Sequence, residues 1–312
     1  MSNIDFHSIE NPLNTPKVNS DPTLNQSTII PSTINEDNSN RTNILFLGCS
    51  QSGYLKEGQS IPWWLLPNLL ALDAPIVAVC WQRFLYANLG QSLNVPASVT
   101  LGLVVWGLYL LDRGLDNRKT QNTSLPDRHR FAQRYNRLFM GVGLTGMLLG
   151  VLTAFVYLPA LSLLSGTILG VLLLLYLIIV HYAPFRLSGS KEFLVGIMFA
   201  AGVAIPLFTH FPDQMSIWFP VVVGFAFLCW LNCLLIDRWE KGSIGFGLFP
   251  MMISSIIAVI ALLSPTPCNL VLFMADSFIL LLHLLRNRLG VRFLRVAVDF
   301  VLIIPLGIEK IL

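Results

Sequence analysis

Long apolar runs dominate this sequence and restrict what it can fold into. A bilayer core about 30 Å thick needs roughly 20 apolar residues per helix, and backbone groups in lipid must be hydrogen-bonded internally, which a helix achieves. About nine runs of this kind follow residue 60, so we predict an all-α, polytopic membrane protein. The expected spans are residues 65–87, 95–111, 138–158, 161–181, 192–210, 216–236, 243–263, 268–285 and 294–311.

The composition of the chain separates a short N-terminal region from the rest. Hydrophobic residues make up 54% of the sequence and charged residues only 12%, against roughly 25% charged in a soluble domain. Residues 1–58 are instead rich in Asn, Ser, Thr and Pro, a composition that cannot offset its ordering entropy by burial. We predict a disordered polar tail over 1–58 and a transmembrane domain over 59–312. Membrane lipids are expected as partners, and nucleic acid is not.

Lys and Arg alternate between the predicted connections. Connections 112–137, 182–191, 237–242 and 286–295 carry basic residues, whereas 88–94, 159–160, 211–215 and 264–267 carry none. By the positive-inside rule, the N-terminus and the basic loops face the cytoplasm, and the C-terminus faces outward. We therefore expect a multi-pass protein of the cytoplasmic (inner) membrane.

Two aspartates, Asp112 and Asp116, stand where the second span meets its polar loop. Residues four apart on a helix share a face, so their carboxylates are expected to lie close together. An interfacial cap that pairs with Arg113 and Arg118 in water would explain the pattern without any function. A cation held between the two carboxylates is the functional alternative.

A second acidic group ends the sixth span on the same predicted side of the membrane. It contains Asp237 and Glu240, and Lys191 begins the fifth span beside it. Mg²⁺ takes one or two carboxylates, several waters and phosphate oxygens. Cationic side chains can hold the remaining phosphate charge. Such a site suits the ionisation of a diphosphate leaving group.

Basic and acidic residues elsewhere add further candidates. The run from Arg128 to Arg137 either binds a diphosphate or anchors to anionic headgroups, and Arg128 and Arg130 are the expected substrate contacts. Ionisable groups inside spans are costly and indicate function. Among them, Asp73 lies about a turn into the first span and is expected to reach the cavity mouth, and Asp299 lies in the last span.

Together, Asp112-x-x-x-Asp116, Tyr182-x-Pro184 with Lys191, the acidic cluster at Asp237 and the nine spans resemble the UbiA superfamily of intramembrane prenyltransferases. The resemblance covers about residues 60–312. It implies a helical bundle around a central cavity, where Mg²⁺ and aspartate-rich motifs bind an isoprenyl diphosphate and an allylic cation passes to a lipophilic acceptor. The implied catalytic and metal-binding residues are Asp112, Asp116, Asp237 and Glu240, and the implied diphosphate-binding residues are Lys191, Arg113, Arg128, Arg130 and Tyr182.

The first motif departs from the family pattern, which commonly reads Asn-Asp-x-x-Asp-x-x-x-Asp. Asp112 and Asp116 match its last two aspartates, and Arg113 matches a frequent neighbour. Leu108 and Tyr109 occupy the Asn and first Asp positions. One ligand group of the family is therefore missing from this motif.

The second motif is also degenerate. The family commonly has Asp-x-x-x-Asp, of which Asp237 matches the first residue while Lys241 replaces the second. Glu240 stands one position earlier and is the expected substitute, with Asn232 nearby. These departures concern the activity more than the fold.

Three other functions fit parts of the pattern. A transporter would place acids at the midplane and show an inverted repeat, whereas the acids here gather at one membrane face. A CDP-alcohol phosphotransferase would carry Asp-Gly-x-x-Ala-Arg, which the sequence lacks. A non-catalytic or repurposed membrane protein on the same scaffold, such as a lipid-binding subunit, is the main alternative because both motifs are incomplete.

Overall fold

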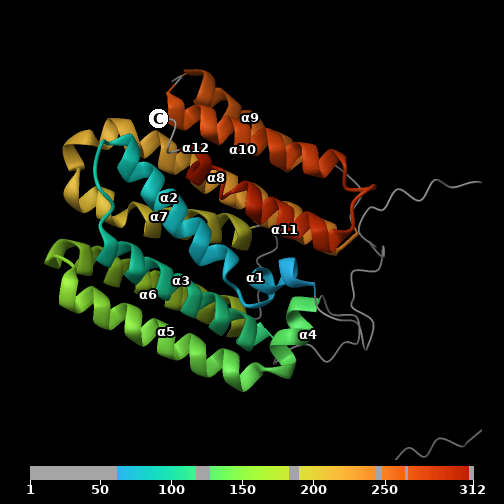
Figure 1. Cartoon of the computed structure of the whole chain (residues 1–312), viewed down its shortest axis with the longest axis horizontal. Helices are drawn as coiled ribbons and strands as arrows, with labels where there is room; N and C mark the ends of the chain where they lie inside the picture. Colours follow the sequence, from blue (N-terminus) through green and yellow to red (C-terminus); the bar gives the residue numbers. More distant parts are fainter. Residues whose placement is uncertain (1–61, 117–126, 183–189, 243–247, 264–265, 309–312) are drawn as a thin grey trace, which may run out of the picture. The chain divides into compact units, whose positions relative to one another are not determined.

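The computed structural model describes residues 62–116, 127–182, 190–242, 248–263 and 266–308. These residues form helices joined by turns, with no strand among them, and all belong to one compact unit, Phe46–Leu312. The predicted tail over 1–58 lies outside the described residues. The helices are η1 (Trp63–Leu65), α1 (Leu66–Leu69), α2 (Asp73–Asn88), α3 (Val95–Asp116), α4 (Asp127–Arg134), α5 (Asn136–Tyr157), α6 (Ala160–Tyr182), α7 (Ser190–His210), η2 (Pro212–Gln214), α8 (Met215–Glu240), α9 (Leu248–Leu263), α10 (Pro267–Leu284), α11 (Val291–Val301) and α12 (Pro305–Ile308) (Figure 1).

Six of the described helices are long and apolar enough to cross a bilayer, namely α3, α5, α6, α7, α8 and α10. They confirm the prediction of an all-helical membrane protein, but the count of nine spans is not confirmed. The first predicted span is a bent pair, Trp63–Leu69 and Asp73–Asn88, with 82° between its halves. The described part of α9 has 16 residues, and the last predicted span is divided into α11 and α12.

The predicted connection 112–137 differs from the structure, because much of it is helical. α3 continues to Asp116, and α4 forms a separate polar helix before α5 begins. Ala132 of α4 is fully buried in a small cluster with Ala71, Leu110 and Phe139. A search for apolar runs cannot detect a helix that buries only one small face, so the sequence pattern missed it.

Close helix packing fixes α3 against α5. A methyl group added at Gly107 of α3 would lie 2.7 Å from the backbone oxygen of Gly143 on α5. One added at Gly150 would lie 2.8 Å from the Val104 side chain. Small residues let helix backbones approach where lipid supplies no hydrophobic drive. The pair therefore holds the polar end of α3 in a fixed place.

The main core lies between α2, α7, α8, α9, α10 and α11. The Trp81 ring stacks on Phe225 with 4.1 Å between centroids, and both are fully buried. The Trp81 indole also donates a hydrogen bond of 2.9 Å to the backbone oxygen of Leu302. This core ties the broken segment after α11 to the first half of the chain.

Candidate functional site

A polar pocket of about 260 Å³ opens where the ends of several helices converge. Its lining combines charged side chains with apolar residues such as Val77, Val195, Phe199 and Leu302. We call this the polar pocket. Its ionisable and amide residues are Asn68 of α1, Asp73 of α2, Tyr109, Asp112 and Arg113 of α3, Arg128 of α4, Tyr176 of α6, Lys191 and Glu192 of α7, Cys229, Asn232, Cys233, Asp237 and Glu240 of α8, and Asp299 of α11.

Most of the site residues predicted from sequence line this one pocket. The structure brings Asp112, Arg113, Arg128, Lys191, Asp237 and Glu240 together from four helices. Arg130 lies on α4 but is not among the lining residues. The side chains of Asp116 and Tyr182 fall outside the described part of the chain, so their predicted roles stay predictions.

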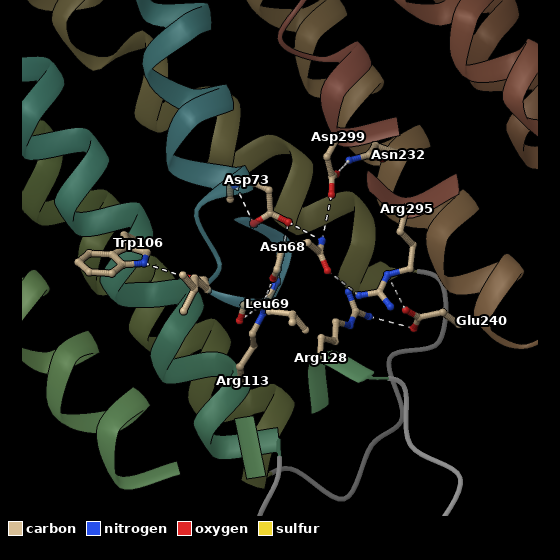
Figure 2. Close-up of polar contacts among 12 residues, drawn as sticks. Asn68, Leu69, Asp73, Trp106, Arg113, Arg128, Asn232, Glu240, Arg295 and Asp299 are labelled. Atoms are coloured by element: carbon tan, nitrogen blue, oxygen red, sulfur yellow. Dashed lines mark hydrogen bonds and ion pairs between the residues drawn. The ribbon is translucent and has the colours of Figure 1, made fainter. Parts of the chain in front are cut away.

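Glu240 holds two arginines at the pocket. Its Oε2 accepts from Arg128 Nη2 at 2.9 Å, and its Oε1 lies 3.2 Å from Arg295 Nε. The three groups come from α8, α4 and α11 (Figure 2). The Arg295 side chain is only 6% exposed, and a charge this deeply buried is costly unless it is paired. Glu240 therefore balances two cations from distant parts of the chain.

Asn68 lies at the centre of a hydrogen-bonded group that we call the Asn68 network, comprising Asn68, Asp73, Asn232, Arg295 and Asp299. Its amide nitrogen donates to Asp73 Oδ2 at 2.8 Å and to Asp299 Oδ2 at 3.3 Å. Its amide oxygen accepts from Arg295 Nη2 at 3.0 Å. Asn232 Nδ2 donates to the other Asp299 oxygen at 3.1 Å (Figure 2). One amide thus links two carboxylates to an arginine.

The break between α1 and α2 positions Asn68. Ala71, fully buried, has a φ of 57°, a left-handed conformation that costs an L-residue roughly 1–2 kcal/mol. Arg113 Nη1 donates to the backbone oxygens of Asn68 and Leu69, and the Trp106 indole donates to that of Leu70 at 3.0 Å (Figure 2). These bonds satisfy the carbonyls of Leu69 and Leu70, which the end of α1 leaves without helical partners. They also add a second donor to the Asn68 oxygen, which already accepts from the Ala71 N–H at 3.3 Å.

The remaining charged pairs near the pocket are more exposed. Lys241 Nζ lies 2.6 Å from Asp237 Oδ2, with the lysine side chain 65% exposed. Lys191 Nζ lies 3.6 Å from Glu192 Oε1, with the lysine 47% exposed. Exposed pairs contribute only about 0–1 kcal/mol. Both lysines can therefore exchange partners at little cost when a ligand binds.

Charge in the pocket does not favour a free anion. The described lining carries six carboxylates, from Asp73, Asp112, Glu192, Asp237, Glu240 and Asp299, and three cations, from Arg113, Arg128 and Lys191. Arg295 and Lys241 pair with two of these carboxylates without lining the pocket themselves. Since most of the basic side chains are already paired with carboxylates, an anionic ligand would have to bind together with a cation.

The described lining of the pocket offers carboxylate ligands for a hard cation such as Mg²⁺, but too few of them to bind it without help from a substrate. Asp112 and Asp237 face the same pocket from α3 and α8, and carboxylate oxygens are the ligands that Mg²⁺ prefers. Among the described residues, no three His, Cys, Asp or Glu side chains are grouped closely enough to hold a metal by themselves. Mg²⁺ commonly binds through one or two carboxylates plus substrate phosphates. Asp112 and Asp237 are therefore the residues that would hold it here.

The sequence pointed to some of these residues and missed others. Asp73 and Asp299 stand out as ionisable groups in apolar surroundings, although their meeting through Asn68 was not predicted. The sequence places Arg295 among the basic residues of a predicted connection, and Glu192, beside Lys191, is not among the predicted site residues. Asn68, in the run "LPNLLALD", carries no pattern that would single it out.

Comparison with known proteins places the chain in no group: it matches no protein-family model, no curated protein and no solved structure.

Proposed function

We propose that this protein is an intramembrane prenyltransferase that moves an isoprenyl group from an isoprenyl diphosphate to a lipophilic acceptor. The observation that carries the proposal is the convergence of Asp112, Asp237 and Glu240 with Lys191 and Arg128 on one pocket. Carboxylates and cations at the end of an apolar bundle suit a ligand with a charged head and a hydrocarbon tail. The apolar part of the pocket wall, which includes Val77, Phe199 and Leu302, suits the hydrocarbon tail.

Charge balance supports a metal-dependent site. A diphosphate carries several negative charges, and the lining carboxylates outnumber the lining cations by six to three. Asp112 and Asp237 would hold Mg²⁺. A metal held there would supply the countercharge for the diphosphate and for the negative charge of the leaving group. Asp116 and Glu240 complete the proposed metal ligands.

The cationic side chains take the rest of the diphosphate. Arg128 and Lys191 line the pocket, and the buried Arg128 Nε makes no hydrogen bond among the described residues. In the proposed step, the bond between the allylic carbon and the diphosphate oxygen breaks and its electron pair leaves with the diphosphate. Arg128, Arg130, Arg113, Lys191 and Tyr182 hold the departing oxygens, while the apolar wall keeps water from the allylic cation.

The proposed architecture is a UbiA-like bundle of nine spans around a central cavity. Six candidate spans and the bent first pair support part of it. In this proposal the N-terminus and the loops of both acidic motifs face the cytoplasm, and the protein resides in the inner membrane. The alternation of basic and uncharged connections supports that orientation.

A second candidate function is a non-catalytic or repurposed membrane protein, such as a lipid-binding subunit or a transporter. The ion pairs of the second motif favour it. Glu240 is engaged by Arg128 and Arg295, and Asp237 by Lys241. Carboxylates neutralised within the protein are less available to a metal.

Binding of geranylgeranyl or farnesyl diphosphate to the detergent-purified full chain, with and without Mg²⁺, tests the proposal. The variants are Asp112→Asn alone and Asp112→Asn with Asp116→Asn. Asp213→Asn is the matched control, since Asp213 lies in η2, before the start of α8 and so at the far end of that helix from Asp237. We expect Mg²⁺-dependent binding to the native chain and the control, and at least tenfold weaker binding to both Asp112 variants.

The other outcomes are equally informative. Diphosphate binding that does not depend on Mg²⁺ and is unchanged by Asp112→Asn would contradict a metal site. It would favour the second candidate function, a non-catalytic membrane protein. The absence of binding by the native chain would do the same. Thermal unfolding of each variant shows whether a loss of binding reflects the site or the fold.

A further inference from the structure

A second hollow lies outside the polar pocket, between α3 and α5. This α3–α5 groove has a volume of about 320 Å³ and shares no lining residue with the polar pocket. It follows α5 from Arg137 to Leu149, about 18 Å at 1.5 Å per residue. Leu103 and Trp106 of α3 form the facing wall. The groove is therefore long, narrow and mostly apolar.

Small residues keep the groove open. A methyl group added at Gly141 would meet nothing within 4 Å, and one added at Gly146 would only reach ordinary contact distance of α3. The facing wall is fixed, because the Trp106 indole is bound to the backbone oxygen of Leu70. Leu138 and Leu149 at the two ends are 60% and 49% exposed. The groove is therefore open at the outer surface of the helix bundle.

One end of the groove is cationic. Arg137 is its only charged lining residue, and in the described part of the chain no ion pair or hydrogen bond engages the Arg137 guanidinium. Arg134, a turn away on α4, packs over the Tyr135 ring at 5.8 Å. No Asp or Glu occurs in the sequence between Arg128 and Lys191, so α5 and α6 supply no carboxylate. Among the described residues, no carboxylate therefore pairs with the Arg137 guanidinium.

We propose that the α3–α5 groove binds one anionic phospholipid, with an acyl chain along Gly141 and Thr145 and the phosphate at Arg137. An apolar channel that ends at a guanidinium with no partner among the described residues is complementary to a chain that ends at a phosphate. A zwitterionic lipid would bring its ammonium group toward Arg134 and Arg137, where like charges repel. The site is independent of the prenyltransferase proposal, because it uses none of the polar-pocket residues.

Lipid retention by the purified full chain tests this site. The protein is equilibrated with equal amounts of dioleoylphosphatidylglycerol and dioleoylphosphatidylcholine, and the bound lipids are counted by native mass spectrometry. We expect the native chain to retain phosphatidylglycerol preferentially. Arg137→Gln should lower that preference about fivefold, the loss of roughly 1 kcal/mol for one arginine at a lipid surface. Gly141→Leu, which fills the groove, should abolish retention of both lipids.

Two variants control for general effects. Arg288→Gln removes an exposed arginine in the turn after α10, and Gly170→Leu enlarges an open glycine on α6. Both should retain lipid like the native chain. Equal retention of the two lipids by the native protein would overturn the proposal, as would an Arg288→Gln effect equal to that of Arg137→Gln. Displacement of phosphatidylglycerol by sn-glycerol 3-phosphate would show a headgroup site without the groove and would also overturn it.

Discussion

Arg113 is expected to be the residue whose loss most disturbs the α1–α2 break. It is 6% exposed and donates to the backbone oxygens of Asn68 and Leu69, with Asp73 Oδ2 at 3.8 Å from Nη2. Leaving a buried carbonyl without its partner costs about 1–3 kcal/mol. Loss of Arg113 leaves the Leu69 oxygen without a donor, whereas the Asn68 oxygen loses one of two donors and keeps the Ala71 N–H at 3.3 Å. The Arg113–Asp73 ion pair is long, at 3.8 Å, so it contributes less to the free energy of unfolding than the hydrogen bonds to the carbonyls do.

We therefore expect Arg113→Gln to lower the free energy of unfolding by about 2–4 kcal/mol. In a protein of this size that loss corresponds to a fall in Tm of the order of 10 °C. Arg113→Lys keeps the charge but offers a single compact ammonium instead of a planar fork, so it should recover only part of the loss. Thermal unfolding in detergent, followed by tryptophan fluorescence or light scattering, measures each variant.

A double-mutant cycle separates the carbonyl bonds from the ion pair. Asp73→Asn removes the carboxylate charge while leaving the backbone oxygens in place. If most of the loss comes from the hydrogen bonds to the carbonyls, the coupling energy between Arg113→Gln and Asp73→Asn should be only about 1 kcal/mol. That value is near the low end of the coupling energies of residues in contact. A coupling as large as the whole Arg113→Gln effect would refute the reasoning, as would an Arg113→Gln protein within 1 kcal/mol of the native chain. Arg288→Gln again serves as the exposed control.

Two further predictions concern packing and charge. Gly107→Ala should destabilise the protein by about 1–3 kcal/mol because its new methyl group meets backbone on α5, whereas Gly170→Ala, in open space, should not; Tm in detergent decides between them. Glu240→Gln should cost about 2–4 kcal/mol because it leaves Arg128 and the buried Arg295 without their shared carboxylate. Lys241→Ala, which removes an exposed pair, should stay within about 0.5 kcal/mol; equal effects of the two changes would contradict the burial argument.

The candidate site shows how far sequence patterns reach. Asp112, Asp237 and Lys191 were each identified by their position at the end of an apolar run, and the structure places all three on one pocket. The sequence marks Arg128 only by its closeness to the first motif. It lies on α4, a helix that was not predicted, and its carboxylate partner Glu240 comes more than 100 residues later.

The sequence by itself determined the class of protein and the boundaries of most helices. Apolar runs of bilayer length cannot leave backbone groups unpaired in lipid, so they must be helical whatever their neighbours are. The tertiary structure alone decided the 82° break at Ala71, the end of α1 held by Arg113 and the meeting of Asp73 with Asp299 through Asn68. These features depend on buried polar groups finding partners from distant segments, and local periodicity carries no information about which segments will meet.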